Sequence, residues 1–248
     1  MLLEPLAPIA LILLLGSIVQ GAVGFAYTLV AMPLLAWFGL DLVSIVTLIL
    51  ISVWVQTTVG VVTLREHVRW PLVGKVTGLR LLAMPLGLAA LATIAAQDQD
   101  VVRRFVGLMV LALVALQIFC EPRKGGIWQK PVALVGASLA SGFFQGLTAM
   151  GGPVLINWVV AQGWPARQMR AFTFAVFFAT LPIHSAMLYW QHGATMQPAL
   201  ITGVLVAPLT FLGARLGVQL GNRFTRERLK QVILGALALI GFSAVVAP

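Results

Sequence analysis

The chain carries Gln20-Gly21-Ala22-Val23-Gly24-Phe25 and, 125 positions further on, Gln145-Gly146-Leu147-Thr148-Ala149-Met150-Gly151-Gly152-Pro153. Each stretch interrupts a long apolar run, and their offset is almost half of the 248 residues. Glycine clusters loosen a helix and expose backbone polar groups that hydrocarbon cannot satisfy. Two such interruptions at corresponding places predict two copies of one membrane unit, with a substrate site where the interruptions meet.

The composition predicts an integral membrane protein. Hydrophobic residues make up 60% of the chain and charged residues 9%, and the mean hydropathy is +1.01. Soluble domains carry about a quarter charged residues, so most of this surface must face lipid. The net charge of +9 does not require a nucleic-acid partner, because Lys and Arg lie in short loops between apolar runs, as the positive-inside tendency explains.

The chain has one cysteine, Cys120, which excludes an intrachain disulfide and a cysteine-based metal centre. We therefore expect no metal site and no cofactor. The first apolar run begins at once and lacks a basic region before it, so we expect no cleavable signal peptide.

Apolar runs separated by charged or turn-forming loops predict the layout of helices. Six runs have roughly the 20 residues of one helical crossing, and two are too long for one crossing and marginal for two. Each long run contains a Gln-Gly stretch near its middle, so we interpret both as helical hairpins that are bent or re-entrant at the break. The runs cover residues 5–38, 42–64, 71–96, 101–119, 131–162, 171–190, 198–220 and 229–247.

The distribution of Lys and Arg tests the hairpin interpretation. If each long run returns to the side it entered, eleven loop Lys and Arg lie on one side and only Arg103 and Arg104 on the other. If each long run crosses once, the same loops divide five against eight, so the positive-inside rule favours hairpins. The eleven residues are Arg65, Arg69, Arg123, Lys124, Lys130, Arg167, Arg170, Arg223, Arg226, Arg228 and Lys230.

This layout predicts an all-α integral membrane protein with two inverted-topology repeats, each a broken or re-entrant helical hairpin followed by three transmembrane helices. The first repeat covers residues 1–120, a cytoplasmic connecting loop covers 121–130, and the second repeat covers 131–248. Three crossings after each hairpin make the second repeat enter from the opposite face, which is the arrangement used for alternating access. Both termini are expected on the outer, periplasmic side of the cell inner membrane.

Several segments together resemble a known family. Gln20 to Ala26 is followed by Ala31-Met32-Pro33-Leu34-Leu35, Ser141-Gly142-Phe143-Phe144 leads into Gln145 to Pro153, and Leu212-Gly213-Ala214-Arg215-Leu216-Gly217 precedes a basic loop. These are similar to the signatures of the TauE/SafE sulfite exporter family of membrane transporters, and the resemblance covers the whole chain in length and segment count. It implies an inner-membrane carrier of small sulfur-containing anions such as sulfite, thiosulfate or organosulfonates, and it does not fix which of them.

The residues themselves also favour an anion as cargo. All seven acids lie at segment ends or in loops, whereas carboxylates inside a membrane commonly mark cation sites and proton relays. The apolar runs keep neutral donors, whose N–H and O–H groups suit the oxygens of an anion, as do the N-termini of broken helices. We expect the substrate-binding residues to be Gln20, Gly21, Gly24, Gln145, Gly146, Thr148, Gly151, Gly152, Asn157 and His184.

Each candidate residue also has a purely structural interpretation. Gln20 and Gln145 would cap broken helix ends, and the glycines would allow close helix packing. His184 is the one histidine inside a crossing and would serve proton coupling or a neutral hydrogen bond. Arg80 and Arg215 lie inside apolar segments, where each would attract an anion or extend to the interface. We expect Gln145 to be an exposed cavity amide, whose loss costs only about 1 kcal/mol of stability.

An enzyme is not expected, because the chain has no HExxH, no GxSxG, no pair of membrane aspartates and no Cys–His cluster. The sequence favours a secondary transporter that exports a small anion by alternating access, with that anion and the lipid bilayer as its partners. The alternatives are an anion channel, which needs a continuous polar lining, and a carrier of another small organic anion. The oligomeric state stays open.

Overall fold

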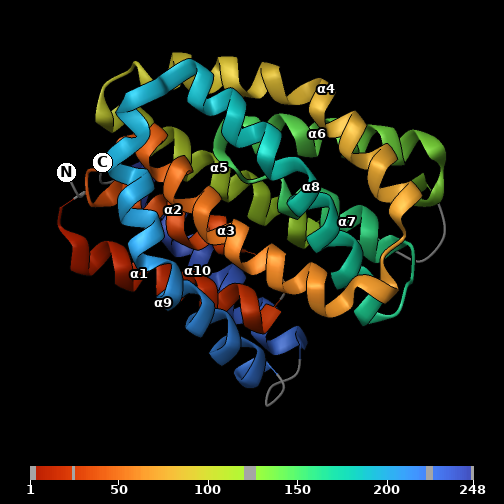
Figure 1. Ribbon diagram of the computed structural model, residues 1–248. Helices are drawn as coiled ribbons and strands as arrows, with labels where there is room; N and C mark the ends of the chain where they lie inside the picture. Colours follow the sequence, from red (N-terminus) through yellow and green to blue (C-terminus); the bar gives the residue numbers. More distant parts are fainter. Residues whose placement is uncertain (1–3, 24–25, 120–126, 222–225, 247–248) are drawn as a thin grey trace.

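The computed structural model describes residues 4–23, 26–119, 127–221 and 226–246, and over these residues it is helical and has no strand (Figure 1). Five helical stretches among them are long and apolar enough to cross a bilayer, which confirms the all-α membrane class. The helices are α1 (Leu6–Val23), α2 (Tyr27–Trp37), α3 (Leu42–Leu64), α4 (Trp70–Ala95), α5 (Gln99–Phe119), α6 (Pro131–Thr148), α7 (Gly152–Ala161), α8 (Ala166–His192), α9 (Gln197–Gly221) and α10 (Arg226–Val246). Short 3-10 helices are η1 (Arg65–His67), η2 (Ile127–Gln129) and η3 (Gly193–Met196).

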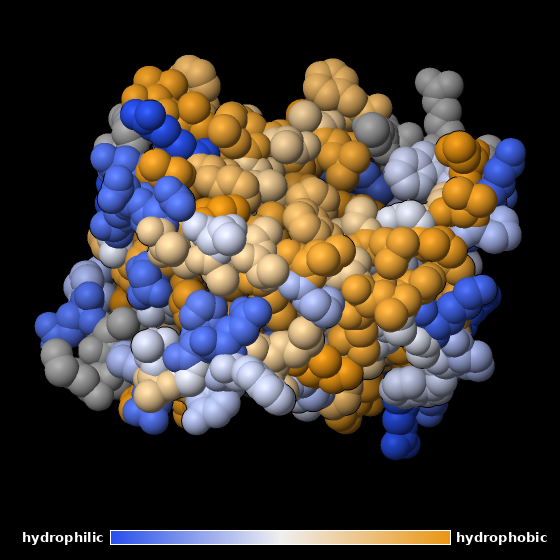
Figure 2. Space-filling view, turned by 90° about the horizontal axis from the view of Figure 1, so that it is seen from above, coloured by the Kyte–Doolittle hydropathy of each residue, from blue (hydrophilic) through white to orange (hydrophobic). Residues whose placement is uncertain are grey.

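The surface carries the pattern of a protein that crosses a membrane. Figure 2 shows hydrophobic residues over the middle of one face, with hydrophilic residues gathered toward its two ends. Large apolar side chains on the outer faces of the long helices are exposed, among them Leu82 on α4, Val204 on α9 and Leu239 on α10. Such side chains are expected to face lipid. The chain is therefore a multi-pass membrane protein.

Both long apolar runs fold as a helix, a break and a second helix, as the hairpin interpretation predicts. The second helices, α2 with 11 residues and α7 with 10 residues, are short. At 1.5 Å per residue they reach about 15–17 Å, roughly half of the 30 Å hydrocarbon core. Each of these half-length helices therefore begins inside the protein, where other helices surround it.

The breaks lie after the Gln-Gly pairs and not at them. Helix α6 continues through Gln145 and Gly146 and ends at Thr148. Ala149 then takes the left-handed conformation, with φ of 55°. The Ala149 N–H donates to the Gln145 carbonyl at 2.9 Å, which is the bond of the αL motif that ends helices, and the Met150 N–H donates to the Phe144 carbonyl at 3.2 Å. In the first half, Ala26 has φ of 83° immediately before α2.

The glycines of the Gln-Gly pairs serve close helix packing. Helix α1 runs along α9, and α6 runs along α4. At five glycines in these two crossings, an added Cβ would lie within 2.3 Å of a backbone carbonyl oxygen of the facing helix, so the helices approach to a distance that only glycine permits. These pairs are Gly21 with Ala214, Gly217 with Ile18, Gly146 with Met84, Gly87 with Phe143 and Gly142 with Arg80.

The two halves of the chain share one core and pair with each other in a reciprocal way. The first helix of each half, α1 or α6, packs on the fourth helix of the other half, α9 or α4. The third helices, α3 and α8, pack together, and so do the fifth helices, α5 and α10. Neither half therefore buries its apolar faces without the other.

Arg103 holds the far end of the short helix α2. Its Nε donates to the Ala36 carbonyl at 3.0 Å, and its Nη2 donates to the Trp37 carbonyl at 3.3 Å. These carbonyls end α2, where a cation also compensates the negative end of the helix dipole. This contact gives Arg103 a structural role on the side to which the sequence interpretation assigns few basic residues.

Candidate functional site

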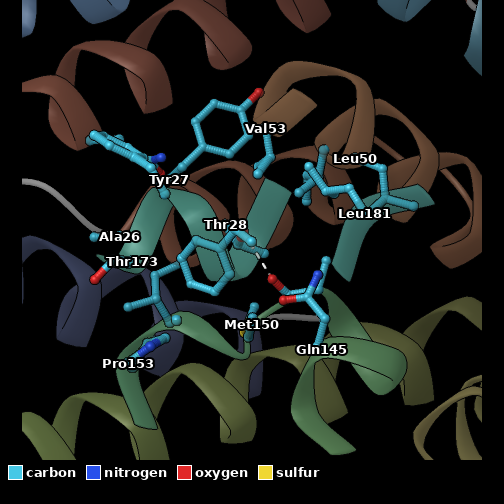
Figure 3. Close-up of a pocket in the computed structure, with 17 residues that line it drawn as sticks. Ala26, Tyr27, Thr28, Leu50, Val53, Gln145, Met150, Pro153, Thr173 and Leu181 are labelled. Carbon is cyan, nitrogen blue, oxygen red and sulfur yellow. Dashed lines mark hydrogen bonds between the residues drawn. The ribbon is translucent and has the colours of Figure 1, made fainter. Parts of the chain in front are cut away.

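A small cavity of about 40 Å³, called the central cavity below, lies where the beginnings of α2 and α7 face each other between α3 and α8. Thr28 Oγ1 on α2 donates to the Ala149 carbonyl at 3.2 Å, which joins the two breaks directly (Figure 3). At roughly 10–15 Å³ for each water centre, the central cavity has room for a few waters or one small oxyanion. Its lining residues are Gln20, Ala26, Tyr27, Thr28, Leu29, Ile49, Leu50, Val53, Gln145, Ala149, Met150, Gly152, Pro153, Thr173, Phe174, Phe177 and Leu181.

The two halves of the chain line the central cavity with corresponding positions. On α3 the lining residues are Ile49, Leu50 and Val53, and on α8 they are Thr173, Phe174 and Phe177. Each of the latter lies 124 positions after one of the former. The glutamines of both Gln-Gly pairs also contribute. The central cavity therefore lies where the halves meet, as the paired interruptions predict.

Two helix N-termini face this space. Residues 27–29 form the first turn of α2, and Gly152 and Pro153 begin α7. The first N–H groups of a helix have no acceptor within the helix, and they carry the positive end of its dipole. Pro153 removes one such donor from α7. The remaining backbone donors favour an anion in the central cavity.

A larger space of about 690 Å³, called the vestibule below, adjoins the central cavity. Both spaces are lined by Gln20, Thr173 and Phe174. The vestibule lies among the last turns of α1, α3 and α9 and the first turn of α8, and Arg170 and Arg215 line it. It therefore reaches toward the side on which the sequence places most loop Lys and Arg, and its two cations would attract anions.

A buried polar cluster stands behind Gln145. Arg80 on α4 is fully buried, and it donates from Nη1 to Ser141 Oγ and from Nη2 to Gln145 Oε1, the latter at 3.2 Å. Its guanidinium carbon lies 5.0 Å from the centre of the Phe177 ring. Ser141 Oγ donates in turn to the Gly151 carbonyl at 2.6 Å. The cluster thus ties α4 to α6 and to the start of α7.

His184 completes this cluster in a defined tautomer. Its Nδ1 lies 3.3 Å from Gln145 Nε2. Because Gln145 Oε1 accepts from Arg80, the amide nitrogen is the group that faces His184 and donates to it. Nδ1 must then carry no hydrogen, so the ring is neutral with its hydrogen on Nε2. This arrangement corresponds to the neutral hydrogen-bonded interpretation of His184 that the sequence left open.

One protein family matches the chain over nearly its whole length. The family model described as Sulfite exporter TauE/SafE matches residues 9–244, nearly the whole length. The chain belongs to this family. TauE/SafE proteins are transporters, and the apolar helices place this one in a membrane. Comparisons with curated proteins and with solved structures give no match.

The ten residues that the sequence singles out in this TauE/SafE protein divide by location. Gln20, Gln145 and Gly152 line the central cavity, and Gly21 lines the vestibule. The other described residues lie around these spaces. Gly146 packs against α4 and Gly151 against α6, and the Thr148 hydroxyl donates within α6. Asn157 donates to the Leu116 carbonyl of α5 at 3.5 Å, and His184 lies behind Gln145. Gly24 lies outside the described residues.

Gln145 is not a freely exposed cavity amide as expected. It is buried, and its oxygen accepts from the buried Arg80. Removing that acceptor would leave a buried guanidinium with fewer partners, which costs more than the loss of an exposed amide. Gln145 therefore combines a place in the lining of the central cavity with a structural bond.

Arg80 contacts two lining residues of the central cavity, Gln145 and Phe177, and its depth in the membrane is visible in the amino-acid sequence. Arg80 lies ten positions after Trp70, where α4 begins, and at 1.5 Å per residue that is roughly 15 Å along the helix. This depth approaches the middle of a 30 Å hydrocarbon core, and the depth was the signal that could have identified it. Ser141, Thr28 and Thr173 had no comparable signal, because their roles depend on contacts between helices.

Proposed function

We propose that this TauE/SafE protein is a secondary transporter that exports small sulfur-containing anions of the sulfite, thiosulfate or organosulfonate class by alternating access. The observation that carries the proposal is the central cavity, where two helix N-termini and the amides of Gln20 and Gln145 surround a space for one small oxyanion. Only neutral side chains line it in the part of the chain that the structure describes. Donors without acidic groups suit an anion and disfavour a metal cation.

The lining supports a carrier over a channel. A channel would need a continuous polar path, whereas Ile49, Leu50 and Leu181 on the helices around the central cavity are apolar. The vestibule, which Arg170 and Arg215 line, adjoins this cavity on one side and would provide access to it. A binding space that opens on one side is what an alternating-access carrier requires in one of its two states.

The reciprocal pairing of helices supports inverted repeats, with residues 1–120 and 131–248 as the two units and 121–130 as the connection. A pseudo-two-fold relation in the membrane plane would exchange the α1–α9 contact with the α6–α4 contact and would keep α3–α8 and α5–α10 in place. Both exchanged contacts and both retained contacts are present. In an inverted repeat the two half-length helices meet near the middle of the membrane.

The orientation can be tested with reporters. We expect a reporter that is active only in the periplasm to be active when fused at Pro248, because eleven loop Lys and Arg on the opposite side hold that side in the cytoplasm. The same reporter inserted beside Lys130 is expected to be inactive. An active reporter beside Lys130, or a cytoplasmic C-terminus, would contradict the proposed topology.

Transport can be tested in proteoliposomes loaded with sulfite or a small sulfonate. We expect a potential that is negative inside to accelerate efflux, because it favours outward movement of an anion by about 2.3 kcal/mol per charge per 100 mV. Efflux should also saturate with substrate, and liposomes without protein should give the background rate. Efflux that ignores the potential would contradict electrogenic export, and flux that rises linearly with concentration would favour a channel.

A further inference from the structure

Arg80 is a buried cation without an acidic partner. Its side chain is 0% exposed, and the one ion pair among the described residues joins Arg103 to Asp100 at the periphery. All seven Asp and Glu of the chain lie at segment ends or in loops. A guanidinium stays protonated in proteins, and a buried charge is unfavourable unless it is paired. The protein therefore keeps one uncompensated positive charge inside its helices.

This charge lies directly behind the wall of the central cavity. Arg80 contacts two of the residues that line this cavity: its Nη2 donates to Gln145 Oε1 at 3.2 Å, and it lies over the Phe177 ring at 5.0 Å. One layer of side chains separates the guanidinium from a molecule in the cavity. In surroundings of low dielectric constant, such a charge acts strongly across this separation.

The other half of the chain has a neutral group at the corresponding place. Arg80 lies four positions before Met84, whose carbonyl faces Gly146, and Thr210 lies four positions before Ala214, whose carbonyl faces Gly21. Thr210 donates to the Ala207 carbonyl at 2.8 Å. Gln145 is thus hydrogen-bonded to a residue with a fixed charge. Thr210, which is the equivalent of Arg80 on α9, carries no charge.

We propose that Arg80 is the residue that makes the central cavity selective for anions, and the proposal rests on the transport function proposed above. Its positive charge attracts the anion through the wall formed by Gln145 and Phe177. Its bond to Gln145 Oε1 also fixes the amide, so that the one N–H not donated to His184 Nδ1, and not the oxygen, remains available to the anion. Arg80 acts through Gln145 and through the electric field, and so it is a positioning and specificity residue that does not itself touch the substrate.

Two substitutions at Arg80 distinguish the effect of its positive charge on anion binding from the effect of its shape. With methanesulfonate as the probe, we expect Arg80→Gln to weaken binding to purified protein by about 30-fold, the effect of a unit charge roughly 8 Å away at an effective dielectric constant near 20. Arg80→Lys keeps the charge and should stay within about fivefold of the wild type. The matched control is Arg104→Gln, which removes an exposed arginine on α5 and should leave affinity unchanged. Wild-type affinity in Arg80→Gln, or an equal loss in Arg80→Lys, would overturn the proposal.

A second variant neutralises Arg80 without removing it. Gln145→Glu has nearly the shape of the native side chain and places a carboxylate where Arg80 already donates. We expect this variant to melt at or above the wild-type temperature, because the buried charge gains a partner, and to lose methanesulfonate binding. Retained binding in a folded Gln145→Glu protein would overturn the proposal even if Arg80→Gln failed to fold.

The same measurements distinguish the two proposals. If the wild type binds neither methanesulfonate nor sulfite, the proposed function fails and the role of Arg80 fails with it. If the wild type binds them and the Arg80 variants bind them equally well, the transport proposal stands and only the role of Arg80 is rejected.

Discussion

Gly142→Ala is expected to destabilise the protein and to abolish anion transport. A Cβ at Gly142 on α6 would overlap the backbone carbonyl of Arg80 on α4, and a backbone atom cannot move aside as a flexible side chain can. The crossing of α4 and α6 would have to open, at a cost of about 1–3 kcal/mol for an overpacked core. The shift would also separate Arg80 from Ser141 and Gln145. Thermal unfolding in detergent and efflux from proteoliposomes measure the two effects.

Gly136→Ala is the matched control for this prediction. Gly136 lies on the same helix, is exposed, and has no atom within 4 Å of an added Cβ. Alanine favours a helix over glycine by about 1 kcal/mol, so this variant should be as stable as the wild type or slightly more stable. Equal melting temperatures for Gly136→Ala and Gly142→Ala would show that the close crossing does not matter for stability.

Thr173→Phe is expected to reduce efflux to the background rate while the protein stays folded. Thr173 lies on α8 and lines both the central cavity and the vestibule. A phenyl ring at this position would occupy space at the boundary that the two cavities share. An anion could then no longer pass from the vestibule to the helix N-termini. Efflux assays and the melting temperature of the purified variant check both parts of the expectation.

The control for this blocked passage is Thr58→Phe. Thr58 is exposed on α3, and its hydroxyl donates to the Trp54 carbonyl of its own helix at 2.7 Å. It lines neither the central cavity nor the vestibule, so a phenyl ring there should enter lipid and leave efflux unchanged. Normal efflux in Thr173→Phe would exclude the passage through Thr173 as the transport route.

The amino-acid sequence determined the membrane class and the order of the helices. The apolar run at 42–64 is α3 (Leu42–Leu64), and the runs at 71–96 and 101–119 correspond closely to α4 (Trp70–Ala95) and α5 (Gln99–Phe119). Hydrocarbon allows only segments that satisfy their own backbone groups, so length and apolar composition suffice to locate crossings. The same constraint predicted that both long runs are interrupted, because a glycine-rich stretch inside an apolar run requires protein around it.

Only the tertiary structure decided what the individual polar residues and glycines do. Gln145 and Arg80 are 65 positions apart, and Ser141 and Arg80 are 61 positions apart, so no local pattern couples them. The Gln-Gly pairs drew attention to the right region, but their glycines pack against α9 and α4, and α1 and α6 end two residues after them. Whether an inner arginine extends to the membrane surface or stays buried beside a binding space depends on the helices packed around it, and their arrangement is set by contacts between distant segments.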